Sequence, residues 1–129
     1  MLAVRIIVGI YLIIHGLCHL VGFVVPWKIA TLKEEPYKTT LLAGAVDIGD
    51  AGIRAVGILW LLAAAGFAAG AVGVFGQWVW WRPLTMGLSI VSLVLCVLGL
   101  PGAKIGILAN AIIIMYLVVG GKFGWVPAG

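Results

Sequence analysis

The sequence predicts an all-α fold: a single four-helix transmembrane bundle of an integral membrane protein. Of the 129 residues, 64% are hydrophobic and only 9% are charged, whereas roughly a quarter of the residues of an average soluble domain are charged. Four apolar stretches approach or exceed the about 20 residues that a helix needs to cross a bilayer. They are continuous, unlike the alternating segments of a transmembrane β-barrel. We expect the four helices at residues 4–25, 52–76, 84–100 and 105–121.

The first apolar stretch is expected to be a retained helix. Arg5 precedes it as in a secretion signal, but no small-x-small cleavage site closes it, and its length is that of a full span. The polar loop over residues 26–49 is the longest connection, so residues 1–129 should form one transmembrane domain without a soluble domain. Glycines within residues 41–50 allow either a re-entrant segment or a tilted extension of the second helix.

Prolines and charges complete the predicted topology. Pro83 suits the start of the third helix and Pro101 its end. Four spans place both termini on one side of the membrane. Basic residues are slightly more frequent on the side of the long loop, which favours a cytoplasmic position for that loop. Those on the loop side are Lys28, Lys33, Lys38 and Lys104, and those opposite are Arg5, Arg82 and Lys122.

Small residues are expected to bring helices together. Gly66 and Gly70 form a GxxxG motif in the second predicted helix, and such spacing lets helix backbones approach closely in lipid. The motif is expected to pack within the bundle, with self-association or docking to another membrane subunit as the alternative. The net charge of +4 is scattered rather than clustered, so the sequence does not indicate a nucleic-acid surface.

Polar residues of three helices are expected to meet in the half of the membrane next to the long loop. The two histidines lie one helical turn apart, roughly 9 and 15 Å below the end of the first helix. Ionisable groups are costly in contact with lipid, so the polar faces of the helices should point at one another, and Asp50 can pair with Arg54 one turn away. The predicted cluster comprises His15, His19, Asp47, Asp50, Arg54, Asn110 and Arg5.

Several kinds of site fit this cluster. The groups could satisfy one another as an interhelical polar clamp. His15 and His19, four residues apart, are half of a common zinc or iron site. Haem ligation by two histidines would require them on facing helices, which leaves only single-histidine ligation. A quinone pocket needs a polar donor, aromatic walls and access from lipid, which His15, Asp50, Arg54, Tyr11 and Trp60 could supply.

The two cysteines, Cys18 and Cys96, are both expected within about 10 Å of the long-loop surface, counted from their helix ends. They could meet as a redox disulfide, or Cys18 could be activated by His15 nearby on the same helix. Buried free cysteines generally act as small hydrophobic residues, and we expect that role here.

Several short motifs resemble the DoxX-like membrane proteins. The opening Leu2-Ala3-Val4-Arg5-Ile6-Ile7-Val8-Gly9 is followed by Tyr11 and by His15-Gly16-Leu17. An Arg, a Gly four residues later and a late His-Gly resemble the start of that family. The segments 54–62, 80–83 and 106–110 are similar to small bacterial relatives. The resemblance implies a four-helix protein of the bacterial cytoplasmic (inner) membrane. It also implies a family in which some members are linked to quinone-coupled sulfur oxidation or to oxidative-stress complexes.

We therefore expect a small non-catalytic subunit of, or accessory protein to, a membrane redox complex, with the lipid bilayer and other membrane subunits or a second copy as partners. One alternative is a redox protein that itself binds quinone, haem or metal. Another is a small-molecule or ion-handling protein that uses Asp47, Asp50 and Arg54 along a hydrated path.

Overall fold

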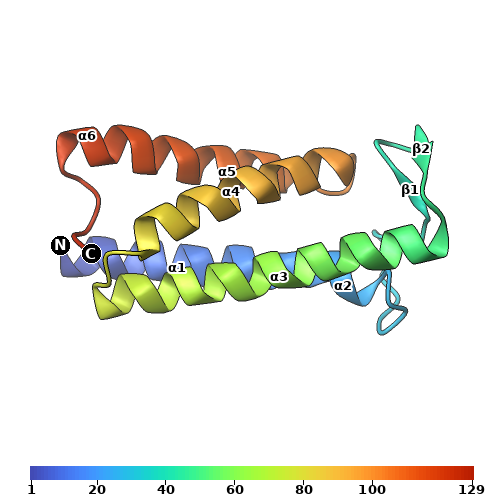
Figure 1. The fold of residues 1–129 in the computed structure, drawn as a ribbon, viewed down its shortest axis with the longest axis horizontal. Coiled ribbons are helices and arrows are strands. Elements are labelled where there is room, and N and C mark those ends of the chain that lie inside the picture. The colour runs from blue at the N-terminus through green and yellow to red at the C-terminus, as the bar shows by residue number, and fades with distance from the viewer.

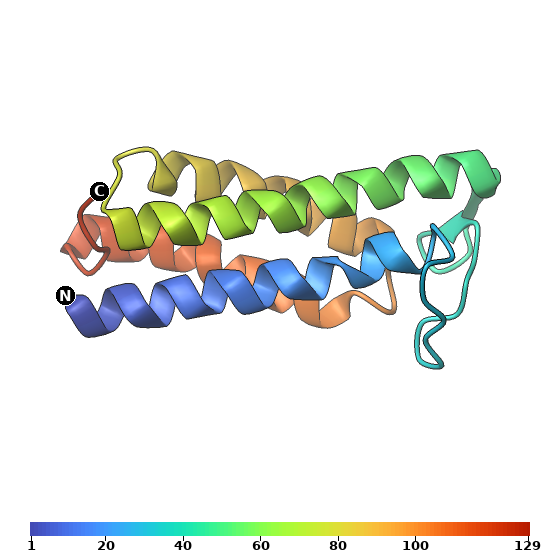
Figure 2. The ribbon, with the colours of Figure 1, turned by 90° about the horizontal axis from the view of Figure 1, so that it is seen from below.

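The computed structural model describes residues 1–129 and contains four long antiparallel helices (Figure 1). All four are long and apolar enough to cross a membrane, over Leu2–Val24, Gly49–Gly76, Trp81–Leu98 and Lys104–Phe123. The predicted all-α four-helix arrangement is therefore confirmed, and the chain is a multi-pass membrane protein. Both termini lie at one end of the bundle and the long loop lies at the other (Figure 2).

The helix boundaries differ from the predicted ones by a few residues. The first span consists of α1 (Leu2–His19) and a short α2 (Val21–Val24), separated at Leu20. Helix α3 (Gly49–Gly76) begins three residues before the predicted start at residue 52, and α4 (Trp81–Leu98) also begins three residues early. The last span is divided into α5 (Lys104–Met115), a π-helical turn η1 (Tyr116–Gly120) and α6 (Gly121–Phe123).

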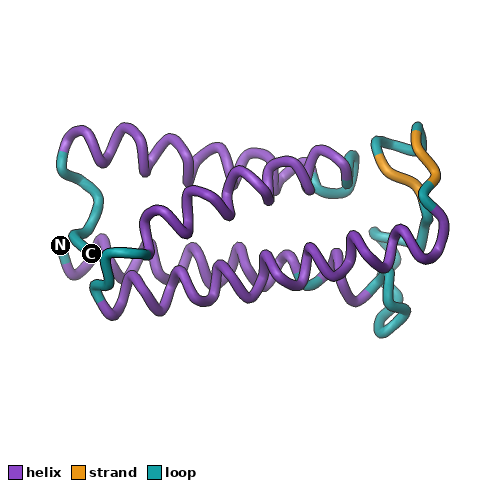
Figure 3. Tube along the Cα trace, in the orientation of Figure 1, coloured by secondary structure: helices purple, strands orange, loops and turns teal.

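Residues 41–50 are neither re-entrant nor a long extension of a helix. They contain a small antiparallel hairpin of β1 (Thr40–Leu41) and β2 (Val46–Asp47), which lies at the loop end of the bundle (Figure 3). Gly49 has a φ of +71° and starts α3 directly after the hairpin. A glycine at this position permits the sharp change of chain direction from strand to helix.

The hairpin turn is fixed to the end of α4. Leu42 and Ala43 adopt left-handed conformations with φ of 52° and 56°. In this conformation their N–H groups donate to the carbonyls of Leu98 and Leu100, at 2.8 and 3.0 Å. The last carbonyls of a helix have no partner within that helix, so the turn caps α4. The loop is thereby held across the end of the bundle.

The helices pack in the order α1, α3, α4 and α5, each against the next. The main hydrophobic core lies in the half of the bundle near the termini, where every helix contributes to it. Gly66 and Gly70 of the GxxxG motif face Leu88 and Thr85 of α4, so this motif brings α3 and α4 together within the bundle. The core residues are Leu12, Phe67, Ala71, Val74, Trp81, Ile113 and Val126.

The C-terminal segment folds back onto this core. Arg82 donates from Nε to the carbonyl of Pro127 at 3.1 Å, and from Nη2 to those of Val126 and Pro127 at 3.0 and 2.6 Å. The hydroxyl of Tyr116 donates to the carbonyl of Trp125 at 3.0 Å. These bonds satisfy carbonyls of a segment without regular secondary structure and hold Val126 in the core.

Candidate functional site

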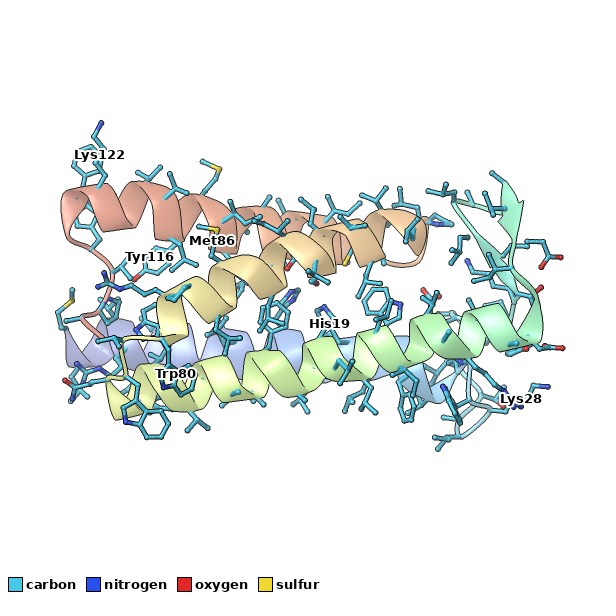
Figure 4. All side chains as sticks on the ribbon, viewed as in Figure 1. His19, Lys28, Trp80, Met86, Tyr116 and Lys122 are labelled. Carbon is cyan, nitrogen blue, oxygen red and sulfur yellow. The ribbon has the colours of Figure 1, made fainter.

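Four buried polar side chains from three helices form one hydrogen-bonded cluster in the middle of the bundle. His15 and His19 come from α1, Ser92 from α4 and Asn110 from α5. The Nε2 atom of His15 lies 3.0 Å from Oδ1 of Asn110, and Nε2 of His19 lies 2.5 Å from Oγ of Ser92. The amide nitrogen of Asn110 donates to Ser92 Oγ at 2.8 Å, which closes the network. Figure 4 shows His19 in the interior, between α3 and the α4–α5 pair.

Two backbone carbonyls anchor this cluster, which we call the histidine cluster (His15, His19, Ser92 and Asn110). Nδ1 of His19 lies 2.7 Å from the carbonyl oxygen of His15, one turn earlier in α1. The amide nitrogen of Asn110 also donates to the carbonyl of Gly106 at 2.9 Å, one turn earlier in α5. Residues four apart share a helix face. The side chains of His19 and Asn110 therefore each contact a carbonyl one turn earlier in their own helix and, at the same time, a side chain of another helix.

Aromatic side chains support the two imidazole rings. The ring centroid of Phe67, a fully buried residue of α3, lies 4.7 Å from that of His15 and 5.1 Å from that of His19. Trp60, two turns earlier in α3, lies with its centroid 5.2 Å from the His19 ring. The aromatic rings therefore hold the imidazoles from the α3 side.

A cavity of about 560 Å³ opens beside the histidine cluster and extends toward the long loop. This volume is within the usual range of about 300–1,000 Å³ for small-molecule sites. The lining is mostly apolar, and its charged residues, Glu35 and Lys38, both belong to the loop that covers the end of the bundle. Both histidines, Tyr11, Trp60, Cys96 and residues of all four spans contribute to the wall.

The cavity reaches the outer surface between α1 and α5. Its lining includes Ile14 and Cys18 of α1 and Ile105 of α5, which are exposed on the outside of the bundle. A hydrogen bond connects α1 and α5 here, because the hydroxyl of Tyr11 donates to the backbone carbonyl of Ala109 at 3.0 Å. We call this opening the lateral opening (Ile14, Cys18, Ile105 and Ala109). It lies within two membrane-spanning helices and faces the position of the lipid.

The three charged residues predicted at the start of the second helix lie outside the histidine cluster. Asp47, Asp50 and Arg54 are exposed at the loop end of the bundle, and none of them lines the cavity. Asp50 accepts a hydrogen bond from the Tyr37 hydroxyl rather than pairing with Arg54, whose guanidinium lies 5.7 Å from the Trp27 ring centroid. The expectation that these groups face the histidines was wrong because the hairpin and the earlier start of α3 leave them exposed on the surface at the loop end of the bundle.

The charges at this surface organise the loop instead. The Gly49 N–H donates to Oδ1 of Asp47 at 3.0 Å and the Thr39 hydroxyl donates to the same atom at 2.9 Å, and both bonds lower the pKa of Asp47. The hydrogen bond of Tyr37 to the Asp50 carboxylate raises the pKa of Tyr37. These contacts connect the loop to the start of α3.

Arg5 also lies apart from the histidine cluster. It is ten residues before His15 in α1, about 15 Å along the helix axis, and its buried Nε atom has no hydrogen-bond partner. The cluster predicted from the sequence therefore reduces to His15, His19 and Asn110.

The histidine pair does not fit a metal site. No group of three or more His, Cys, Asp or Glu side chains is arranged to hold an ion. Both ring nitrogens of His19 already have partners, and so does Nε2 of His15. One free nitrogen remains in the pair, whereas structural and catalytic metal sites use three or four protein ligands. Because the other three histidine nitrogens have hydrogen-bond partners, His15 Nδ1 is the one histidine nitrogen that could face a haem iron.

Ser92 was not predicted from the sequence, although its hydroxyl connects two other members of the cluster, His19 and Asn110. A signal for it exists in α4, where Thr85, Ser89, Ser92 and Cys96 follow each other at spacings of four, three and four residues. This spacing defines one helix face, and all four residues are buried. Cys96 also lies next to the cluster, with its sulfur 3.6 Å from the Asn110 amide nitrogen, and both cysteines are free.

Comparison of the chain with protein-family models, with curated proteins and with solved structures finds no match. Membership of the DoxX-like family thus stays a prediction from the motifs quoted above.

Proposed function

We propose that this protein binds an uncharged, lipid-soluble small molecule of the quinone class in the cavity, as an accessory component of a membrane redox system. The observation that carries the proposal is the apolar cavity of about 560 Å³ that opens between α1 and α5 and ends at the histidine cluster. Such a cavity can receive a molecule from the bilayer without passage through water. The polar group of the molecule would lie beside His15 and its apolar part would extend toward the lateral opening.

The electrostatics of the cavity support an uncharged ligand. At the depth of the histidines the wall carries no Asp, Glu, Lys or Arg, since Glu35 and Lys38 belong to the covering loop. A charged ligand moved to this depth would lose its hydration without gaining a partner of opposite charge, which is strongly unfavourable. A transport path for ions along Asp47, Asp50 and Arg54 has less support, because these residues do not line the cavity.

The redox setting and the accessory role rest on the resemblance to DoxX-like proteins. The histidine cluster does not supply a set of metal ligands, so electron transfer by this chain would depend on the bound organic molecule or on a partner subunit.

Photocrosslinking tests the binding proposal. The probe is a fully ring-substituted benzoquinone, which resists addition of thiols, with a photoreactive diazirine on its tail. Reconstituted protein is irradiated and the modified residues are mapped by mass spectrometry. We expect crosslinks at the lateral opening, on residues such as Ile14, Cys18 and Ile105, and we expect excess unmodified quinone to suppress them.

Two tryptophan variants provide the matched comparison. Ala109→Trp fills the wall of the cavity, whereas Leu108→Trp places the same side chain at the next residue, which is 62% exposed and does not line the cavity. Crosslinking should be lost in the first variant and kept in the second. Crosslinks spread evenly over the lipid-facing surface, or unchanged in Ala109→Trp, would refute binding in the cavity.

A further inference from the structure

The hydrogen positions of the histidine cluster follow from its two backbone anchors. A carbonyl oxygen can only accept a hydrogen bond. The nitrogen that His19 directs at the His15 carbonyl, Nδ1, must therefore carry a hydrogen. The Asn110 side-chain atom that faces the Gly106 carbonyl must likewise be the NH₂ group, which fixes the orientation of this amide.

These two assignments determine the remaining ones. With the Asn110 NH₂ group placed, its Oδ1 atom faces His15, so Nε2 of His15 must be the donor. The second amide hydrogen goes to Ser92 Oγ. In a neutral His19 with hydrogen on Nδ1, Nε2 is an acceptor, and the Ser92 hydroxyl donates to it. Every hydrogen bond in the cluster then has one donor and one acceptor without any charged group.

One atom of the cluster remains without a partner. Because Nε2 of His15 carries the hydrogen, its Nδ1 atom has a free lone pair and no hydrogen. No group of the protein donates to this atom, and it is not among the fully buried polar atoms without partners. It therefore keeps accessible surface, and His15 lines the cavity. The cavity ends at a hydrogen-bond acceptor.

We propose that the cavity selects molecules whose polar group donates a hydrogen bond, a phenolic or alcoholic hydroxyl, which His15 Nδ1 accepts. The inference rests on the proposed binding function and specifies its ligand class. Within quinone chemistry it favours the quinol form over the quinone, because a quinone carbonyl brings a second acceptor against Nδ1. An acceptor left unpaired on burial is unfavourable, so carbonyl- and ether-bearing molecules should bind more weakly.

Trp60 is the residue that could reverse this selectivity. It lines the cavity, and its indole N–H has no hydrogen-bond partner in the protein. Its ring extends between Gly22 of α2 and Gly99 beyond α4, at the loop end of the cavity. A carbonyl compound could be recognised there, and the variant Trp60→Phe removes that donor.

Two probes of equal shape test the selectivity. A long-chain alkylphenol and its methyl ether differ by one hydrogen-bond donor. Binding of each to the protein in lipid nanodiscs is measured by equilibrium dialysis. We expect the phenol to bind about fivefold more tightly, as a net hydrogen bond of ordinary strength provides.

The double variant His15→Phe/Asn110→Leu removes the acceptor. Phenylalanine keeps a ring at position 15 but has no nitrogen, and leucine at position 110 ensures that Asn110 Oδ1, which pairs with His15 in the natural sequence, is not left as a new acceptor. We expect this variant to bind both probes equally and at the affinity of the methyl ether. Selectivity that persists in the double variant, or equal binding of the two probes to the natural sequence, would overturn the inference. Tighter binding of the ether that disappears in Trp60→Phe would overturn it as well. Binding of neither probe would refute the cavity function itself.

Nitrogen NMR provides a test without any variant. The chain contains two histidines, so selective ¹⁵N-histidine labelling gives a spectrum of His15 and His19 alone. We expect opposite neutral tautomers, with hydrogen on Nε2 of His15 and on Nδ1 of His19. The phenol should shift the Nδ1 signal of His15 and the ether should not. The same tautomer in both residues, or a charged His15, would contradict the hydrogen positions and overturn the inference.

Discussion

Ser92 is the residue on which the histidine cluster depends most. Its hydroxyl accepts from Asn110 and donates to His19, so one small side chain joins α1, α4 and α5. The neighbouring Ser89 is equally buried, but its hydroxyl has no hydrogen-bond partner. Two serines on one face of α4 therefore have the same burial and different roles.

This difference predicts that the same substitution has different effects on stability at the two positions. Ser92→Ala leaves His19 Nε2 and one Asn110 hydrogen without a partner, which should reduce the free energy of unfolding by about 1–2 kcal/mol. Ser89→Ala removes a hydroxyl that bonds to nothing and should leave the stability unchanged or slightly higher. Thermal unfolding in detergent, followed by circular dichroism, measures both. Equal losses in the two variants would show that Ser92 does not hold the cluster.

At the level of elements, the loop between α2 and α3 closes the end of the bundle. Its hairpin turn caps α4, and Asp47 accepts the Gly49 N–H at the start of α3. Because Glu35, Lys38 and Leu41 also line the cavity, this loop forms the wall of the cavity at the loop end of the bundle.

The hairpin should depend on pH through Asp47. Its pKa is lowered in the folded state, so the stabilisation is complete above the ordinary Asp pKa of about 3.9 and is lost as pH falls through the lower folded value. The amide signal of Gly49 in NMR spectra should move toward that of an unstructured loop as pH falls below about 4. In Asp47→Ala the signal should already have that position at neutral pH. A Gly49 signal that is independent of pH in the natural sequence would contradict the contact.

The position of the C-terminal segment depends on the hydrogen bonds of Arg82. Arg82→Met keeps the apolar stem of the side chain but loses the bonds to the Val126 and Pro127 carbonyls. Hydrogen exchange at the Trp125 amide, which donates to Gly120, should become faster. Lys122→Met removes a nearby positive charge from an exposed side chain without hydrogen bonds to this segment and should leave the exchange rate unchanged. Similar rates in Arg82→Met and in the natural sequence would show that the core alone holds the segment.

For the whole molecule, the two halves of the bundle differ in packing. The half near the termini holds the hydrophobic core around Phe67 and Trp81, and the half near the loop holds the cavity. The helices approach closely where Gly66 and Gly70 face α4. Because the packed half near the termini stabilises the fold, the half near the loop can contain a cavity for a ligand.

The sequence predicts this architecture well and the site only in part. Length and composition of the apolar stretches determine four spans, because each must cross the bilayer. The histidines and Asn110 were found because polar groups at membrane depth must pair inside the bundle. Asp47 and Asp50 were misplaced because Asp47 belongs to the hairpin strand β2 and Asp50 to the first turn of α3, and strands of two residues are too short to give a recognisable sequence pattern. Ser92 escaped notice because a serine is common in helix packing and its partner lies on another helix.

The most direct test of ligand binding in the cavity is native mass spectrometry of the protein extracted from its own membrane in mild detergent. The natural sequence and Leu108→Trp should each retain one lipid-soluble molecule per chain, and Ala109→Trp, with the cavity filled, should retain none. A natural protein without a bound molecule, or equal occupancy in all three proteins, would contradict the role of the cavity.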